Sequence, residues 1–84
     1  MGRRRKLEPS RQRIARNVAM LRAAQGYTQH ELGQLAGLHR TFIGAIERAE
    51  VNVSIDNVDR IALALSVDPV ELLAPKQPRV RGSA

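Results

Sequence analysis

Residues 28–48, TQHELGQLAGLHRTFIGAIER, constrain the fold more than any other part of the chain. Thr28 can cap a helix through its hydroxyl, and Glu31 can accept a hydrogen bond from the N–H of the cap residue, which makes a capping box. Gly37 follows the last apolar residue of this helix, where a positive φ costs least for glycine. The order of residues therefore predicts a helix over 29–36, a turn at 37–39 and a second helix over about 40–48.

The second predicted helix has two different faces, because successive side chains advance by about 100° around a helix axis. Its apolar face contains Phe42, Ile43 and Ile46. Gly33 in the first helix allows the two helices to cross closely, and this pattern indicates a helix-turn-helix unit, whose second helix lies in the major groove of DNA. The opposite face carries two cations, a hydroxyl and two small residues: Arg40, Thr41, Gly44, Ala45 and Arg48.

These residues resemble those of a known family. The run from Gln29 to Arg48 looks like the helix-turn-helix of the Cro and phage-repressor class of bacterial regulators, and residues 52–73 are similar to that family's fourth and fifth helices. The resemblance covers roughly residues 12–74 and implies an all-α, five-helix, lambda-repressor-like domain. Within the class, the run RTFIGAIERAE is most similar to the controller proteins of restriction-modification systems.

The composition excludes several kinds of site. The 84 residues suit one domain, with no cysteine and two isolated histidines, so neither a disulfide nor a cluster of metal ligands is expected. No carboxylate pair, nucleophile with a base, or phosphate-cradling glycine loop is present. No apolar run approaches the ~20 residues of a membrane span, and no secretory signal is apparent. We expect a cytoplasmic protein with no cofactor, no metal, no small-molecule ligand, no membrane partner and no enzymatic activity.

The charges are distributed unevenly along the chain. Residues 1–48 hold ten basic and three acidic side chains, residues 49–74 hold one basic and five acidic, and residues 75–84 hold three basic and none acidic. A basic first half that carries a helix-turn-helix is typical of a protein that binds a polyanion, although basic runs also arise for solubility alone. We therefore expect double-stranded DNA as the partner.

Three segments are expected: a disordered basic arm over 1–8, a helix-turn-helix domain over 9–74 and a flexible tail over 75–84. The arm either follows the phosphates or enters a minor groove, or it is a solvated tail. Ser10 is expected to cap the first helix of the domain. Three arginines of this helix are expected to face solvent: Arg11, Arg13 and Arg16.

Two helices are predicted after the motif. Ser54 is expected to cap a fourth helix, and Asp68 followed by Pro69 predicts a short fifth helix that ends near Leu73. The buried stripe of the fourth helix is predicted to consist of Ile55, Val58, Ile61, Ala62 and Leu65.

The second helix of the motif is expected to read the DNA. Arg40 can bond both O6 and N7 of guanine, and Thr41 can contact a thymine methyl or a phosphate. Gly44 and Ala45 are small and let the helix lie deep in the groove, and Ala45 can also touch a thymine methyl. Arg48 is expected to hold the DNA backbone.

Three residues around this helix are further candidates for DNA contact. Gln29 lies in the first turn of its helix, where free N–H groups and the helix dipole favour a phosphate, and the family resemblance also implies a phosphate contact. His39 either lies beside a phosphate or is a turn or cap residue. Asn52 either bonds a phosphate or shapes the loop after the helix.

The resemblance has two structural implications. It implies that Arg22 reaches Glu47 in the second helix of the motif and forms a partly buried ion pair. It also places a glycine after Arg48, where this chain has Ala49, so that the alanine either changes the exit from the helix or carries about 1 kcal/mol of strain.

The expected function is sequence-specific binding of a partly palindromic operator by a homodimer, as a transcriptional regulator. A DNA-binding antitoxin of a toxin-antitoxin pair is the alternative, although the tail after Pro75 is short for a partner-binding segment. The segment 49–74 is the expected place for the two-fold contact because it carries few basic groups. The candidate interface residues are four valines taken to be exposed: Val51, Val53, Val67 and Val70.

Overall fold

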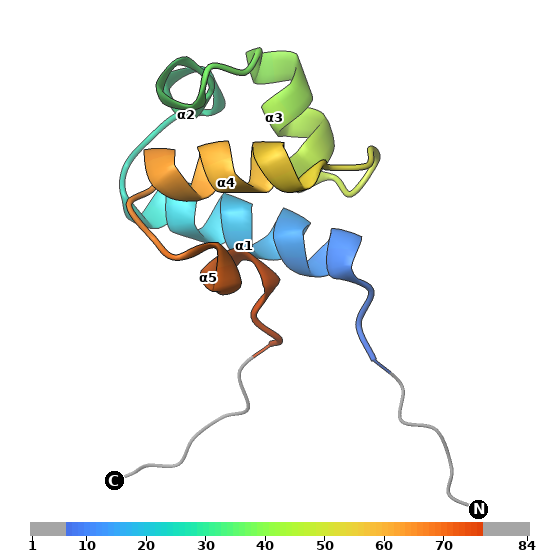
Figure 1. Cartoon of the computed structure of the whole chain (residues 1–84). Coiled ribbons are helices and arrows are strands. Elements are labelled where there is room, and N and C mark those ends of the chain that lie inside the picture. The colour runs from blue at the N-terminus through green and yellow to red at the C-terminus, as the bar shows by residue number, and fades with distance from the viewer. Residues whose placement is uncertain (1–6, 77–84) are drawn as a thin grey trace, which may run out of the picture.

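The computed structural model describes residues 7–76, and these residues form five α-helices and no strand. In Figure 1, α2 and α3 lie on one side of the molecule, α5 lies on the opposite side, and α1 and α4 lie between them. The all-α, five-helix prediction is confirmed. The predictions for most of the arm and most of the tail fall on residues 1–6 and 77–84, outside the described residues. The helices are α1 (Ser10–Ala24), α2 (Gln29–Ala36), α3 (Arg40–Glu47), α4 (Ile55–Ala64) and α5 (Pro69–Leu73).

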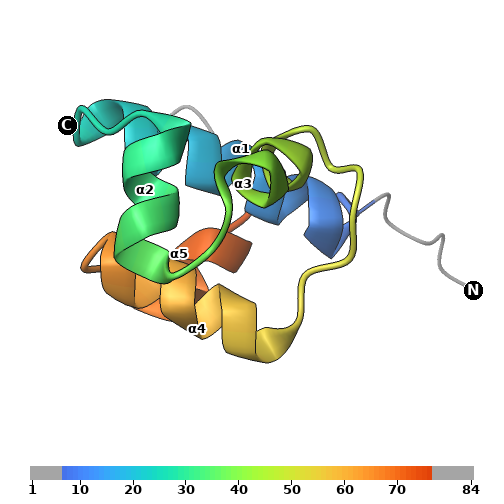
Figure 2. The same cartoon turned by 90° about the horizontal axis from the view of Figure 1, so that it is seen from above.

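One hydrophobic core joins all five helices. α3 packs on α1, α2 packs on α4, and α5 contacts both α1 and α4, so that the core lies between these pairs. Figure 2 shows the same arrangement from above, with α1 and α4 on opposite sides of α5. Burying one such aliphatic side chain stabilises the fold by roughly 1.5–3 kcal/mol relative to exposing it. The largest fully buried side chains are Val18, Leu32, Ile43, Ile46, Ile61, Leu65 and Leu72.

The helix ends agree with the sequence at most positions. Thr28 Oγ1 accepts from the Glu31 N–H at 3.0 Å and Glu31 Oε1 accepts from the Thr28 N–H at 2.8 Å, which is the predicted capping box. Gly37 ends α2 with φ 73°. Ser54 and Asp68 cap α4 and α5 through their side chains. These ends are fixed by residues close together in sequence, which explains why the pattern predicts them.

The predictions for the first residues of α1 and α4 are wrong. Ser10 does not cap α1: the N-cap is Pro9, whose carbonyl accepts from the N–H groups of Gln12 and Arg13 at 3.0 and 3.1 Å. Ile55 does not belong to the buried stripe of α4, because its exposed fraction is 73%. Burial in α4 begins one turn later, at Val58, since the first turn of the helix extends past the edge of the core.

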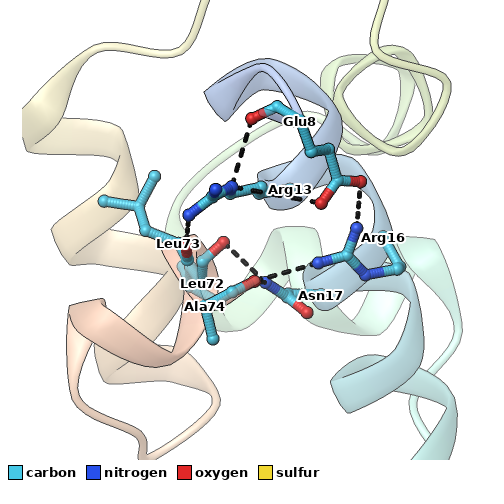
Figure 3. A network of polar contacts seen from close by, with 7 residues as sticks. All are labelled: Glu8, Arg13, Arg16, Asn17, Leu72, Leu73 and Ala74. Carbon is cyan, nitrogen blue, oxygen red and sulfur yellow. Dashed lines mark hydrogen bonds and ion pairs between the residues drawn. The ribbon is translucent and has the colours of Figure 1, made fainter. Parts of the chain in front are cut away.

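Arg13 and Arg16 do not face solvent as expected, because they hold the end of α5 against α1 (Figure 3). Arg13 Nη1 donates to the carbonyl of Leu73 at 3.2 Å, and Arg16 Nη2 donates to that of Ala74 at 2.9 Å. The buried Asn17 Nδ2 donates to the carbonyls of Leu72 and Ala74 at 3.0 and 2.9 Å. The last carbonyls of a helix have no hydrogen-bond donors within that helix. At the end of α5, side chains of α1 supply these donors.

Glu8 joins the same cluster from the other terminus. Its carboxylate pairs with Arg16 Nη1, and its carbonyl accepts from Arg13 Nε at 3.2 Å. The last residue of the segment predicted as a disordered arm is therefore held by the domain. Figure 3 shows Glu8 and Ala74 on either side of these two arginines.

Ala49 has φ 58°, so of the two alternatives the alanine keeps the left-handed exit and carries the strain. This conformation costs an L-residue roughly 1–2 kcal/mol, and a glycine avoids that cost. Because glycine also has more conformational freedom in the unfolded chain, the net gain in stability is smaller than the cost avoided. We expect Ala49→Gly to raise the free energy of unfolding by about 0.5–1 kcal/mol in urea denaturation. The matched control is Ala19→Gly in the middle of α1, which should lower the free energy of unfolding by about 0.5–1 kcal/mol. Equal losses in both variants would contradict strain at Ala49.

Candidate nucleic-acid interface

The turn between α2 and α3 fixes how α3 is presented. A Cβ added to Gly33 would lie 2.4 Å from the carbonyl oxygen of Leu38 and 3.3 Å from the backbone nitrogen of Arg40. The N–H of Leu38 donates to the carbonyl of Gly33 at 2.8 Å, so the backbone of the turn lies directly on α2. This close approach requires glycine, and it agrees with the crossing predicted from the sequence.

The outer face of α3 presents most of the predicted residues. Arg40, Thr41 and Arg48 are exposed and Ala45 is partly exposed, while Ile43 and Ile46 point into the core. The described structure thus confirms the two faces expected from the helical period. The outer face of α3 therefore presents cationic and hydroxyl groups with only small residues between them. Such a surface suits close approach to a polyanion.

Gly44 differs from this expectation because it is buried rather than open. A Cβ at this position would lie 3.1 Å from Arg48 Nη1 and 3.3 Å from Gln29 Oε1. The ends of these two side chains therefore cover Gly44. The space left by the missing side chain at Gly44 is filled by the ends of Gln29 and Arg48. An approaching ligand would meet these two side chains rather than the backbone of Gly44.

Arg22, Glu47 and Gln29 form a polar connection between α1, α3 and α2. Arg22 Nε and Nη2 donate to the two carboxylate oxygens of Glu47 at 2.6 and 3.0 Å, and Arg22 Nη1 donates to the carbonyl of Tyr27 at 2.8 Å. Gln29 Nε2 donates to Glu47 Oε1 at 2.9 Å. The hydrogen bond and charge of Glu47 raise the pKa of Arg22, although burial alone would lower it. The pair implied by the resemblance is present in the structure.

His39 is the N-cap of α3. Its Nδ1 accepts from the backbone N–H of Thr41 at 3.0 Å, which matches the cap reading of the two that the sequence left open. The imidazole remains exposed beside the turn. An open hollow of about 610 Å³ lies here between α2 and the start of α3, lined by His30, Gly33, Gln34, Gly37, Leu38, His39 and Arg40.

A carboxylate that the sequence did not single out lies beside Arg48. Arg48 Nε donates to Glu50 Oε1 at 3.0 Å, and both side chains are exposed. Their attraction is therefore screened by solvent and worth little to stability. The same guanidinium also lies over Gly44, where its Nη1 would be 3.1 Å from an added Cβ.

Arg11 is also near this surface, although the sequence indicated only a solvated cation. Its Nη2 donates to Asn52 Oδ1 across 41 positions of sequence. This contact supports the loop-shaping reading of Asn52 and brings a further cation to the loop that follows α3. A contact between residues this far apart leaves no local pattern, so the sequence offered no signal for it.

The four valines proposed for the dimer interface are placed differently from one another. Val51, Val53 and Val67 are partly buried and pack against the core, so the expectation that they are exposed is wrong. Val70 has an exposed fraction of 62%. The sequence missed two larger exposed apolar side chains of α4, Ile55 at 73% and Leu63 at 81%.

Residues 7–76 lack two other classes of site. No group of three or more histidine, cysteine, aspartate or glutamate side chains is placed to hold a metal ion in this part of the chain. None of the helices described for it is both long and apolar enough to cross a membrane.

Comparison with known proteins agrees with this geometry. Control protein C.SmaI of Serratia marcescens is 38% identical over 60 residues, which cover 71% of each chain. The Neisseria hypothetical transcription factor of Neisseria meningitidis is 37% identical over 68 residues, which cover 81% of this chain and 64% of that protein. The match thus spans less than two thirds of the Neisseria protein.

A solved structure of a controller protein is also similar to this chain. The restriction-modification controller protein C.AhdI of Aeromonas hydrophila superposes with a TM-score of 0.72 at 37% identity, covering 74% of this chain and 94% of that one. The model of the helix-turn-helix family HTH_3 matches residues 18–72, which include α2, the turn and α3. The chain therefore belongs to the HTH_3 helix-turn-helix family, and it is similar to restriction-modification controller proteins.

Proposed function

We propose that this protein regulates transcription by binding a partly palindromic operator as a homodimer. The observation that carries the proposal is the outer face of α3, which presents Arg40, Thr41 and Arg48 to solvent within a helix-turn-helix. In this motif the second helix enters the major groove, where each base pair presents a distinct pattern of donors and acceptors. The family is one of DNA-binding regulators, and we propose no enzymatic activity for the chain.

The residues at the start and middle of α3 are proposed to contact bases. Arg40 is the first residue of α3, and its exposed guanidinium can donate two hydrogen bonds to O6 and N7 of guanine. Thr41 and Ala45 are proposed to contact thymine methyl groups. Gly44 contributes by leaving space for the side chains that cover it.

A second set of residues is proposed to hold phosphates. Gln29 lies at the start of α2, where free N–H groups favour an anion, and Arg48 lies at the end of α3. His39 and Asn52 lie in the turn before α3 and the loop after it. Contacts of this kind set affinity and register but carry no sequence information.

Dimerisation is proposed to use the side of the molecule formed by α4 and α5. Ile55, Leu63 and Val70 are large apolar side chains exposed there, and apolar area of this kind is stabilised when a second subunit covers it. In dimers of this motif the two recognition helices contact half-sites about 34 Å apart, one helical turn of DNA. This proposal replaces three of the four valines expected from the sequence.

The similarity to C.AhdI and to C.SmaI supports a more specific role. The C.AhdI structure is that of a restriction-modification controller protein, and C.SmaI is a control protein. We propose that this protein likewise controls the expression of restriction and modification genes. An endonuclease and a methylase gene beside its own gene would support this role.

Selection of binding sites from random DNA tests the proposal. The full chain is expected to select two related half-sites, and Arg40→Ala should lose preference at one base pair of each half-site, by about 1–3 kcal/mol. Arg48→Ala is the matched control, because it removes a cation from the same helix and should weaken binding to all sequences alike. Base reading by α3 would be refuted if the selected DNA showed no common sequence, or if Arg40→Ala kept the base preference of the wild type.

A further inference from the structure

We infer that Arg11 and Asn52 form a binding site for a phosphate of the DNA backbone, beside the C-terminal end of α3. The inference deepens the proposed function and rests on it. It assigns a role to Arg11, which the sequence indicated only as a solvated charge. It also assigns Asn52 one specific atom for the contact.

The geometry brings Arg11 to the end of the recognition helix. Figure 2 shows the loop between α3 and α4 passing beside the N-terminal end of α1, where Arg11 is the second residue. Arg11 lines two surface hollows, one of about 370 Å³ shared with Asn52 and one of about 330 Å³ shared with Ala49. Ala49 directly follows Arg48, so Arg11 belongs to the same end of the surface that α3 presents.

The chemistry of the contact determines which atoms face outward. A guanidinium has only donors, so the atom of Asn52 that faces Arg11 must be the carbonyl Oδ1. The Nδ2 group, with two donors, is therefore directed away from Arg11, and the structure gives it no acceptor within residues 7–76. Arg11 and Asn52 are both exposed. A phosphate can accept hydrogen bonds from such neighbouring donors, and a large share of the hydrogen bonds between proteins and DNA go to phosphate oxygens.

The charges nearby favour an anion at this position. The first turn of α1 has no acidic side chain, so the positive end of its helix dipole is not neutralised from within the helix. The carboxylate in the loop after α3, that of Glu50, is engaged by Arg48 Nε at 3.0 Å. Glu8, the carboxylate that precedes α1, pairs with Arg16, and no ion pair is found for Arg11 among residues 7–76.

The alternative is that Arg11 and Asn52 only hold the loop in place. The two readings differ in the variants Arg11→Ala and Asn52→Asp. Asn52→Asp keeps an acceptor for Arg11, and so keeps the loop contact, but it replaces the outward donor with a negative oxygen. A structural role predicts only the small loss of affinity that one added negative charge near DNA causes in general, whereas a phosphate site predicts that Asn52→Asp binds DNA less tightly than Arg11→Ala.

The test measures the affinity of the full chain for a selected duplex and a random duplex at several salt concentrations. For Arg11→Ala we expect a loss of affinity on the order of tenfold on both duplexes, and a salt slope smaller by about 0.9, the value for one phosphate contact. Asn52→Asp should lose more. The control is Arg60→Ala, which removes an exposed cation of α4 and should leave the slope unchanged. Thermal unfolding of each variant separates lost binding from lost folding.

The outcomes distinguish this inference from the proposed function. An unchanged salt slope in Arg11→Ala, or wild-type affinity in a folded Asn52→Asp, would overturn the phosphate site even if the wild type prefers the selected duplex. A wild type that binds both duplexes equally would contradict sequence-specific regulation, and the slope of Arg11→Ala would still decide the phosphate site. A wild type that binds neither duplex would overturn both.

Discussion

Replacing Glu47 with alanine is expected to lower the free energy of unfolding by about 3–5 kcal/mol, because it leaves the guanidinium of Arg22 largely desolvated without its partner. The side chains of Arg22 and Glu47 are 19% and 7% exposed, and two hydrogen bonds join them. The pair connects α1 to α3, so its loss should also loosen α3 on the body of the domain. Gln29 Nε2 would lose its acceptor in the same variant.

Urea denaturation of Glu47→Ala, Arg22→Ala and the double variant gives the coupling energy of the pair. We expect the double variant to lose much less than the sum of the two single losses, because neither charge is then left unpaired. Arg60→Ala is the control for loss of an exposed arginine and should change stability by less than about 0.5 kcal/mol. Strict additivity of the two single variants would show that the pair contributes no coupling.

Gly33→Ala is expected to destabilise the domain by about 1–3 kcal/mol or more, because the new Cβ would overlap backbone that has little freedom to move. It would lie 2.4 Å from the carbonyl oxygen of Leu38, in the turn that joins α2 to α3. Relief of this overlap must move α3 relative to α2. We therefore expect a loss of DNA affinity beyond the loss caused by unfolding, measured at a temperature where the variant is folded.

Gly44→Ala is the matched control, since it places the same methyl group at a buried glycine of the same motif. Its Cβ would meet only the ends of the Gln29 and Arg48 side chains, at 3.3 and 3.1 Å, and these ends can rotate away. Alanine also favours the helix by about 0.5–1 kcal/mol over glycine. Stability should therefore change little in Gly44→Ala, and equal losses in the two variants would contradict a specific requirement for glycine at position 33.

The sequence predicted the helix-turn-helix well because its determinants are local. The capping box of Thr28 and Glu31, the left-handed Gly37 and the two faces of α3 each depend on residues within a few positions of one another. The helical period alone assigns Ile43 and Ile46 to the core, and the structure buries both. The positive φ at Ala49 came from the family resemblance, since no residue pattern around an alanine indicates it.

The remaining features depend on how distant segments meet. Arg13 and Arg16 fall on a polar side of α1, and only the position of α5 converts them from solvated charges into donors to its carbonyls. The covering of Gly44 depends on Gln29, which comes from another helix. Ile55 has the spacing of a core residue but lies beyond the edge of the core. Periodicity assigns a direction to a side chain, but it does not say whether another element is present in that direction.

The contacts between α1 and the carbonyls of residues 72–74 have a consequence for synthesis on the ribosome. Asn17 is 4% exposed in the finished domain, and both of its recorded acceptors belong to Leu72 and Ala74. A nascent chain in which residues 72–74 are still inside the ribosome already contains α2 and α3, but its Asn17 has neither of these acceptors. The body that supports α3 therefore closes only after α5 has emerged.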